Sequence, residues 1–332
     1  MVPLMSQDSA DAMSMPAATT APRPRHGSSA WGDRIILGAF AACAWLVLLL
    51  VLTLFIRLAV AAWPAVHTVG LAALQSATWD PSSGKYGLLS FIYGTLVTSG
   101  IALLLAGPIG VGAALMLAEV APRRLATPFA MLIELLAAVP SVVFGIWGLF
   151  VLAPIMRNII EPALAHSLGF LPLFQGYFYG VGLLTAGILL AIMILPTVTA
   201  ISRDIFEAVP REQREAMLAL GSTKWEMLTR AVIPYARSGI IGALVLALGR
   251  ALGEAMAVVM VIGNKPAISA SLFSPGYTLA SVLANEFTEA TGQQYVAVLV
   301  GIGSLLFILS MIVNVFARLL VRSVGGAQRG RA

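Results

Sequence analysis

Long apolar stretches separated by short polar segments make up most of this chain. The first stretch covers residues 35–56, and five more lie within 86–118, 135–156, 177–200, 238–263 and 290–317. About 20 apolar residues are enough for a helix to cross the hydrocarbon core of a bilayer. Helices are expected because lipid offers no hydrogen-bond partner to an open backbone. The pattern therefore predicts an all-α, polytopic membrane protein with six transmembrane helices.

The composition supports this prediction because the chain has too few charges to cover a soluble surface. Of its 332 residues, 59% are hydrophobic and 11% are charged, whereas soluble domains carry about 25% charged residues. A soluble globular enzyme is therefore excluded. The 20 Lys and Arg residues outnumber the 15 Asp and Glu and give a net charge of +5. They do not cluster on one polar face, so no nucleic-acid partner is expected.

The polar segments divide the chain into parts. Residues 1–34 are rich in Ala, Ser and Pro and lack apolar periodicity, which predicts a disordered cytoplasmic tail. The first transmembrane helix is expected within 35–62 and is retained, since its apolar run is too long for a signal peptide. A core of five further helices is expected within 88–320, including a cytoplasmic loop over 203–237. A second cytoplasmic tail is expected over 321–332.

The basic residues predict the orientation. Most of them lie in the N-terminal tail, the segment around Arg123, the cytoplasmic loop and the C-terminal tail. Cytoplasmic segments carry the excess of Lys and Arg in membrane proteins, so both termini are expected in the cytoplasm. The alternate, outer segments are short: roughly 62–86, 157–176 and 264–291. Within the last of these, 278–287 is expected to form a short interfacial helix.

The cytoplasmic loop contains signals for two short helices. Pro210 suits the first turn of a helix, and Gly221 is well placed to end that helix in a left-handed cap. Thr223 and Glu226 form a T-x-x-E capping box, which starts the second helix. Pro234 is expected to end the second helix just before the fifth transmembrane helix.

These two helices carry several apolar side chains: Met217, Leu218, Leu220, Trp225, Met227 and Leu228. Apolar groups on a helix that projects into water need a partner to cover them. One interpretation is that a second protein docks on 212–228. The other is that these side chains fold back onto the helix ends of the protein itself.

The sequence EAMLALG at 215–221 resembles the EAA loop of ABC importer permeases. That family has E-A-A, three residues, Gly, nine residues and then I-x-L-P. The spacing is kept here, with matches at Glu215, Ala216, Gly221 and Pro234 and departures at Met217, Ala231 and Ile233. In the family, this loop is a coupling helix that sits in a groove of a cytoplasmic ATPase. The resemblance implies an ATPase-coupling set: Glu215, Ala216, Met217, Leu220, Gly221, Trp225 and Pro234.

Three longer stretches are similar to phosphate importer permeases of the PstC type. They are AVPREQREA at 208–216, LAAVPSVVFG at 136–145 and GRALGEAMA at 249–257. The resemblance covers roughly 90–320. It implies a type I ABC importer permease fold in a bacterial inner membrane. It also implies a complex with a second permease, an ATP-binding subunit dimer and an extracytoplasmic phosphate-binding protein.

Two charged residues, Arg250 and Glu254, interrupt the fifth apolar stretch. At 1.5 Å per residue Arg250 would lie about 18 Å deep, where a charge costs at least about 2.5–3.5 kcal/mol. A spacing of four places both residues on one helical face. Because a guanidinium suits phosphate oxygens, one interpretation is an anion path in which Glu254 holds and tunes Arg250. The other is a structural ion pair between helices.

The sequence contains no G-x-x-x-x-G-K-[ST] phosphate loop and no hydrolase motif. With one cysteine and scattered histidines, no metal or other cofactor is expected, and the chain itself is not expected to be an enzyme. The leading hypothesis is a membrane subunit of an ATP-driven phosphate importer. The alternatives are a permease for another oxyanion such as sulfate or molybdate, an ATPase-independent anion carrier or channel, and a membrane-embedded enzyme. The last is disfavoured because the Arg–Glu pair lacks a nucleophile.

Overall fold

The computed structural model describes residues 30–329. The first part of helix α1, up to Leu54, forms one unit, and the chain from Phe55 onward forms a second. Most of the predicted N-terminal tail lies outside the described residues, but its last residues are helical because α1 begins at Ala30. The predicted C-terminal tail is also helical as far as it is described, since the last helix, α13, runs to Arg329.

Six helical runs in the described part of the chain are long and apolar enough to cross a membrane, as predicted. They cover Arg34–Val69, Leu89–Val120, Ser141–Leu168, Leu183–Glu207, Lys224–Leu252 and Gln293–Leu319. The third and fifth runs differ from the predicted segments in where they begin and end. Both differences occur where the sequence places a proline or a glycine.

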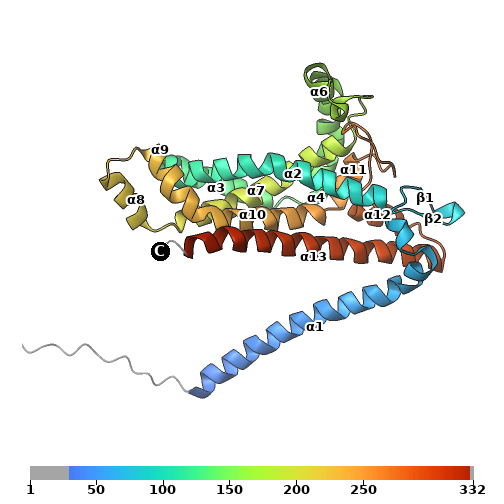
Figure 1. Ribbon diagram of the computed structural model, residues 1–332, viewed down its shortest axis with the longest axis horizontal. Coiled ribbons are helices and arrows are strands. Elements are labelled where there is room, and N and C mark those ends of the chain that lie inside the picture. Colours follow the sequence, from blue (N-terminus) through green and yellow to red (C-terminus); the bar gives the residue numbers. More distant parts are fainter. Residues whose placement is uncertain (1–29, 330–332) are drawn as a thin grey trace, which may run out of the picture. The chain divides into compact units, whose positions relative to one another are not determined.

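The described part of the chain is built from helices and one small hairpin (Figure 1). The long helices are α1 (Ala30–Val69), α2 (Leu89–Leu115), α7 (Leu183–Glu207), α10 (Ile233–Leu252) and α13 (Gln293–Arg329). Shorter helices are α3 (Arg123–Ala137), α4 (Ser141–Trp147), α5 (Ala153–Ile155), α6 (Glu161–Leu168), α8 (Arg211–Ala219), α9 (Lys224–Met227), α11 (Met256–Val261) and α12 (Leu279–Glu286).

Tighter and wider helical turns extend or join these helices. The π-helical turns are η3 (Met116–Val120), η4 (Gly148–Leu152), η5 (Met156–Ile160) and η7 (Leu228–Val232). The 3₁₀ turns are η1 (Leu71–Leu74), η2 (Pro81–Ser83) and η6 (Pro172–Phe174). The strands β1 (Trp79–Asp80) and β2 (Lys85–Tyr86) pair antiparallel, with Trp79 opposite Tyr86.

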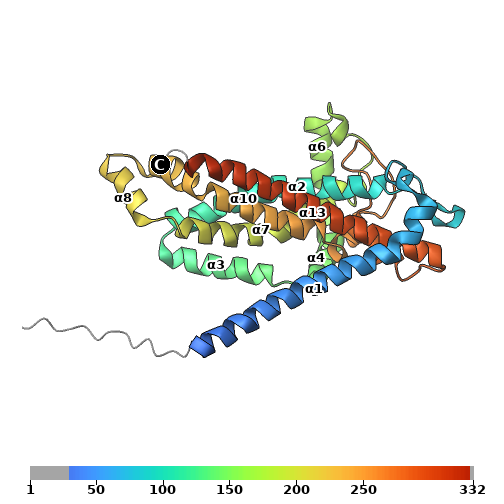
Figure 2. The same cartoon turned by 60° about the horizontal axis from the view of Figure 1, so that its bottom comes forward.

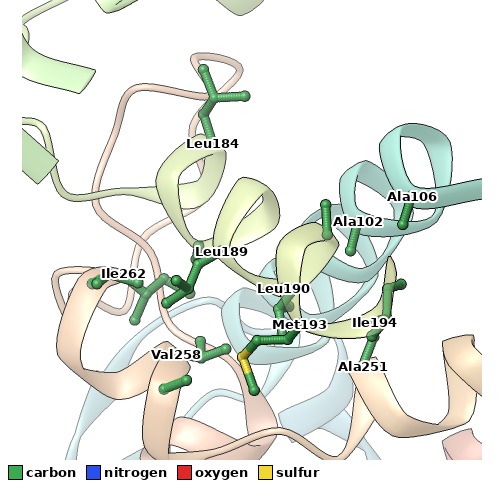
Figure 3. Close-up of a cluster of buried hydrophobic side chains, with 14 of the residues drawn as sticks. Ala102, Ala106, Leu184, Leu189, Leu190, Met193, Ile194, Ala251, Val258 and Ile262 are labelled. Atoms are coloured by element: carbon green, nitrogen blue, oxygen red, sulfur yellow. The ribbon is translucent and has the colours of Figure 1, made fainter. Parts of the chain in front are cut away.

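Helix α7 is the centre of the bundle formed with α2, α10 and α13, which run side by side in both views (Figures 1 and 2). In its most apolar window 67% of the residues are buried, against 22% for α13. Ala102 and Ala106 of α2 join Leu190 and Met193 of α7 and Ala251 of α10 in one buried cluster (Figure 3). The apolar face of α7 is therefore covered by protein, whereas the outer helices keep faces for lipid or partners.

Small residues let α2 and α7 approach closely. A Cβ added at Gly187 of α7 would lie 2.6 Å from Cγ2 of Ile101, and one at Gly110 of α2 would lie 2.8 Å from Cγ1 of Val198. Close backbone approach through small residues is a main source of helix association in membranes, where lipid tails are as apolar as the side chains. The α2–α7 contact is of this kind.

The third predicted transmembrane segment is divided between two helices. Helix α3 ends at Ala137, and a new helical run begins at Ser141, directly after Pro140. A proline disfavours the helical conformation of the residue before it, here Val139, so the helix breaks at this point. The second run continues through η4, α5 and η5 to Leu168 and leaves the bundle crosswise in both views (Figures 1 and 2).

The fifth run begins earlier and ends earlier than predicted. Helix α9, the π-helical turn η7 and α10 are continuous, so Pro234 lies in the first turn of α10 and does not end a helix as expected. The wide turn before Pro234 accommodates its ring and its missing N–H. At the other end, α10 stops at Leu252, and the short helix α11 follows after the interruption Gly253–Ala255.

The predicted helix at 278–287 is present as α12, and its expected interfacial position stays a prediction. Thr278 and Ser281 form its capping box. Val282 is fully buried in a cluster with Phe91 of α2 and Leu299 of α13. Helix α12 therefore packs one face against α2 and α13, at the end of the bundle opposite α8 (Figure 1).

Candidate coupling surface and transmembrane path

Helices α8 and α9 form a corner at one end of the bundle, which we call the docking unit (residues 211–227). The corner is built as the sequence predicts. Gly221 adopts φ +81°, a conformation that favours glycine, and its N–H donates to the carbonyl of Leu218 at 3.0 Å. Thr223 and Glu226 form the capping box that begins α9, with Glu226 N–H donating to Thr223 Oγ1 at 3.3 Å.

The apolar side chains of the docking unit, together with Leu228 directly after it, divide into two groups. Leu218, Leu220 and Trp225 are exposed, with 48%, 83% and 67% of their surface accessible. Met227 and Leu228 are buried at 4% and 3%, which corrects the expectation that they face water. Part of the apolar set therefore folds back on the protein, as the second interpretation expects, and part is left uncovered, where docking of a second protein stays a prediction.

The buried group fastens the docking unit to the bundle. Met227, Leu228 and Val232 pack with Phe206 at the end of α7 and with Ala114 of α2. Met217 of α8 is half-buried against the same cluster. We call this the basal cluster. It joins the docking unit to α2 and α7 and, through Ala236 and Ile240, to α10.

The residues that match the EAA pattern do not all lie together. Glu215, Ala216 and Gly221 are exposed on the docking unit, near Leu220 and Trp225 in sequence. The seventh member of the predicted set, Pro234, is half-buried beyond the π-helical turn η7, in α10. The docking unit thus carries the exposed part of the motif, and the proline belongs to the helix that leads away from it.

The structure contains an ion pair beneath α8 whose two residues, Arg214 and Glu119, are not candidates in the sequence analysis. Arg214 Nη2 lies 2.6 Å from Glu119 Oε1, and Nε of the same arginine donates to that oxygen at 3.1 Å. The partners are 95 residues apart. The sequence does show that Glu119 is a single carboxylate at the end of an apolar run. It does not show which arginine pairs with Glu119.

The second candidate site lies at the interruption of the fifth run. Arg250 occupies the last turn of α10, and Glu254 lies beyond the end of that helix at Leu252. Glu254 Oε1 instead accepts the N–H of Ala257 at 3.3 Å and caps α11. The expected shared helical face is therefore wrong, because the helix ends before it reaches Glu254.

Arg250 is exposed, and within residues 30–329 no hydrogen bond or ion pair holds its guanidinium. Asn314 of α13 is nearby in the bundle, since a Cβ at Gly249 would lie 3.7 Å from both atoms of its amide. Irregular backbone at membrane depth is tolerated where it is buried in protein or lines a cavity. Arg250 beside such an interruption is free to meet an anion or a partner helix.

Comparison with known proteins places the chain in a family. Residues 106–326 match the family described as binding-protein-dependent transport system inner membrane component. A chain of the MetNI methionine ABC transporter in an inward-facing conformation superposes with a TM-score of 0.56 at 16% identity. This comparison covers 74% of the chain and 99% of that structure. The fold is thus that of an ABC importer permease, and the protein is a multi-pass inner membrane component of a transport system.

Curated relatives narrow the family further. The chain is 46% identical over 296 residues to the phosphate transport system permease protein PstC of Mesorhizobium japonicum, covering 88% of the chain and 90% of the relative. It is 44% identical to PstC of Xylella fastidiosa strain Temecula1, covering 92% and 96%. The PstC protein of Haemophilus influenzae is 41% identical, covering 90% and 95%. The chain belongs to the PstC family of phosphate transport system permeases, which confirms the resemblance seen in its sequence.

Proposed function

We propose that this chain is a membrane-spanning subunit of an ATP-driven importer of inorganic phosphate. The observation that carries the proposal is the 46% identity, along 88% of the chain, to a protein named as a phosphate transport permease. The exposed part of the EAA-like motif on a projecting docking unit supports the same conclusion. ATP would be hydrolysed on a separate polypeptide.

The docking unit would provide the link to the motor. Leu218, Leu220 and Trp225 leave an apolar surface uncovered at the end of the bundle that carries most of the basic residues. A cytoplasmic ATP-binding subunit dimer would cover this surface. A second permease and an extracytoplasmic phosphate-binding protein would complete the complex. The α8 end would then face the cytoplasm, and we expect both termini on that side of the membrane from the distribution of basic residues.

The transmembrane path would pass Arg250. The guanidinium is charged at every relevant pH and presents several donors to phosphate oxygens. Its exposed position suits a path formed between this chain and the second permease. Glu254, which caps α11, would hold the interruption beside Arg250 in shape. Rocking of the two permeases would open the path alternately to each side, driven by ATP binding in the separate ATP-binding subunits that contact the docking unit.

Reconstitution tests this proposal. The four-component complex is placed in vesicles, and uptake of radiolabelled phosphate is measured with and without ATP, and with excess sulfate or molybdate. We expect uptake that requires ATP and the binding protein and that neither competitor reduces. Competition by sulfate or molybdate would favour another oxyanion as cargo. Steady phosphate flux through vesicles that contain this chain alone would instead favour an ATPase-independent carrier.

A further inference from the structure

We propose that Arg214 and Glu119 form a buried clamp that transmits the displacement of α8 to the ends of α2 and α7. The inference rests on the proposed function, since it needs a motor that moves the docking unit. Arg214 is a positioning residue in this proposal: it touches neither cargo nor nucleotide. Its role is to keep α8 and the two transmembrane helices moving as one body.

The clamp connects three segments through one side chain. Arg214 reaches Glu119, in the π-helical turn η3 that ends α2, through Nε and Nη2. The same guanidinium donates to the carbonyl of Phe206 at 2.7 Å and to that of Val209 at 2.5 Å. The Phe206 carbonyl lies in the last turn of α7 and the Val209 carbonyl lies just beyond the end of that helix. A cation is favoured there by the helix dipole.

The inner face of α8 consists of two side chains. Arg214 and Met217 are half-buried, and every other residue of α8 is exposed. They are three positions apart, so they lie on one side of the helix. Met217 rests on the basal cluster, where an unbranched apolar side chain can adapt to a shift. Arg214 provides the directional part of the contact.

The chemistry of the clamp resists sliding. The side chain of Glu119 is 8% exposed and that of Arg214 is 18% exposed, so neither charge is well solvated if the other moves away. Hydrogen bonds between ionised groups are short and strongly directional. A displacement of α8 alone would separate a buried charge pair and uncap α7. A joint displacement of α8 with α2 and α7 keeps every one of these contacts.

The chain offers a matched control in the second Arg–Glu pair. Arg203 Nε donates to Glu207 Oε1 at 2.8 Å, also at the end of α7. This pair lies within one helix, and its side chains are 26% and 49% exposed. It has the same chemistry and a similar position but joins no separate segments. Glu207→Gln should therefore leave coupling unchanged.

The first measurement follows the position of α8 in the assembled complex. Spin labels are attached at Glu212→Cys and Asp204→Cys, two exposed positions, in a Cys43→Ser background. We expect one narrow distribution of the distance between the two labels for the parent and for Glu207→Gln. We expect a broader distribution of this distance for Glu119→Gln and Arg214→Lys. Lysine keeps the charge but lacks the fork that reaches Glu119 and both carbonyls.

The second measurement is the amount of inorganic phosphate transported per ATP hydrolysed in vesicles. In Glu119→Gln we expect this ratio to fall about tenfold, while the ATPase stays bound in pull-down and continues to hydrolyse ATP. A merely structural role would lower the yield of complex without changing the ratio in the complex that forms. Arg214→Lys provides the milder variant if Glu119→Gln assembles poorly.

The outcomes separate this inference from the proposed function. If Glu119→Gln and Arg214→Lys keep both the narrow distribution and the parental ratio, the clamp is overturned and the importer proposal stands. If the parent complex retains no ATPase, the proposed function and the transmission role both fail. A lower ratio in Glu207→Gln equal to that in Glu119→Gln would also overturn the clamp, because charge loss near α7 would then suffice.

Discussion

Trp225 and Leu228 lie three positions apart, yet their surroundings differ, and we expect one to contribute to binding and the other to stability. Trp225 is 67% exposed and Leu228 is 3% exposed. An indole that a partner covers contributes a large apolar area to binding. A leucine buried in the basal cluster contributes to folding instead. The two positions therefore separate binding of the ATPase from stability of the chain.

The Trp225→Ala variant should weaken ATPase binding without unfolding the chain. Loss of a central aromatic anchor costs about 2 kcal/mol, or roughly 30-fold in affinity. Stability should change by less than about 0.5 kcal/mol because the side chain is exposed. Affinity is measured by titrating ATPase onto the immobilised permease pair, and stability by thermal unfolding in detergent.

Leu228→Ala is the matched control for that experiment. It should lower the free energy of unfolding by about 2–5 kcal/mol, as truncation of a buried leucine does. Equal ATPase affinity for Trp225→Ala and the parent would show that the exposed indole is not part of the docking surface. A large loss of stability in Trp225→Ala would assign it to the fold instead.

Arg250 is the other residue whose surroundings indicate a function. In Arg250→Gln, phosphate uptake should fall about 10- to 100-fold, because hydrogen bonds to charged groups contribute about 1.5–3 kcal/mol each. Assembly should persist, since no described contact depends on this guanidinium. Uptake and co-purification are measured on the same preparations, with Lys265→Gln, an exposed charge outside the helices, as control. If Arg250→Gln takes up phosphate at the rate of the parent, Arg250 is not part of the transport path and has a structural role only.

At the scale of elements, the decisive feature is the corner between α8 and α9. Gly221 adopts a positive φ and has open space around its missing side chain, so its conformation rather than its size is needed there. The turn sets the direction of α9 relative to α8 and thereby the spacing of Leu220 and Trp225. The docking surface depends on this one backbone conformation.

Substitution of Gly221 should therefore uncouple transport in a graded way. Gly221→Ala should cost about 1–2 kcal/mol in the corner. Gly221→Pro should cost more, because proline fixes φ near −65° and removes the N–H that donates to Leu218. We expect ATPase retention and uptake to fall in the order parent, Ala, Pro, while membrane insertion persists.

Gly112 provides the comparison for this series. It lies inside α2 with open space around it and no positive φ, so Gly112→Ala should preserve uptake and gain about 0.5–1 kcal/mol in helix stability. If Gly221→Pro retains both the ATPase and uptake, the corner is not needed for docking.

At the scale of the whole molecule, the second unit has two different ends. The docking unit lies at one end of the bundle, and the β1–β2 hairpin and α12 lie at the other (Figure 1). The basic residues of loop 203–237 lie at the docking end. This asymmetry predicts which end faces the cytoplasm.

Labelling of introduced cysteines tests the orientation. In a Cys43→Ser background, Ser82→Cys of the hairpin should react with a membrane-impermeant thiol reagent in spheroplasts. Gln213→Cys of α8 should react only after the inner membrane is permeabilised. Both positions are exposed, so a difference in reaction reports the side of the membrane. The reverse pattern would place the docking unit outside and contradict ATPase coupling.

The sequence by itself determined the features that depend on neighbouring residues. The number of transmembrane runs follows from the length of apolar stretches, because lipid selects helices of sufficient length. The corner at Gly221 and the caps at Thr223 and Thr278 follow from local backbone chemistry. The family resemblance follows from short, well-spaced motifs. Each of these features depends on residues that are close together in the sequence.

Only the tertiary structure decided which of several equivalent side chains meets which neighbour. Leu220 and Leu228 are the same residue type on the same projecting loop, and only packing against Phe206 buries the second. Arg214 meets Glu119 across 95 residues, a pairing set by how α2 and α7 end side by side. Arg250 and Glu254 part because the helix ends at Leu252. Burial and pairing are properties of three-dimensional neighbours, which a one-dimensional pattern does not specify.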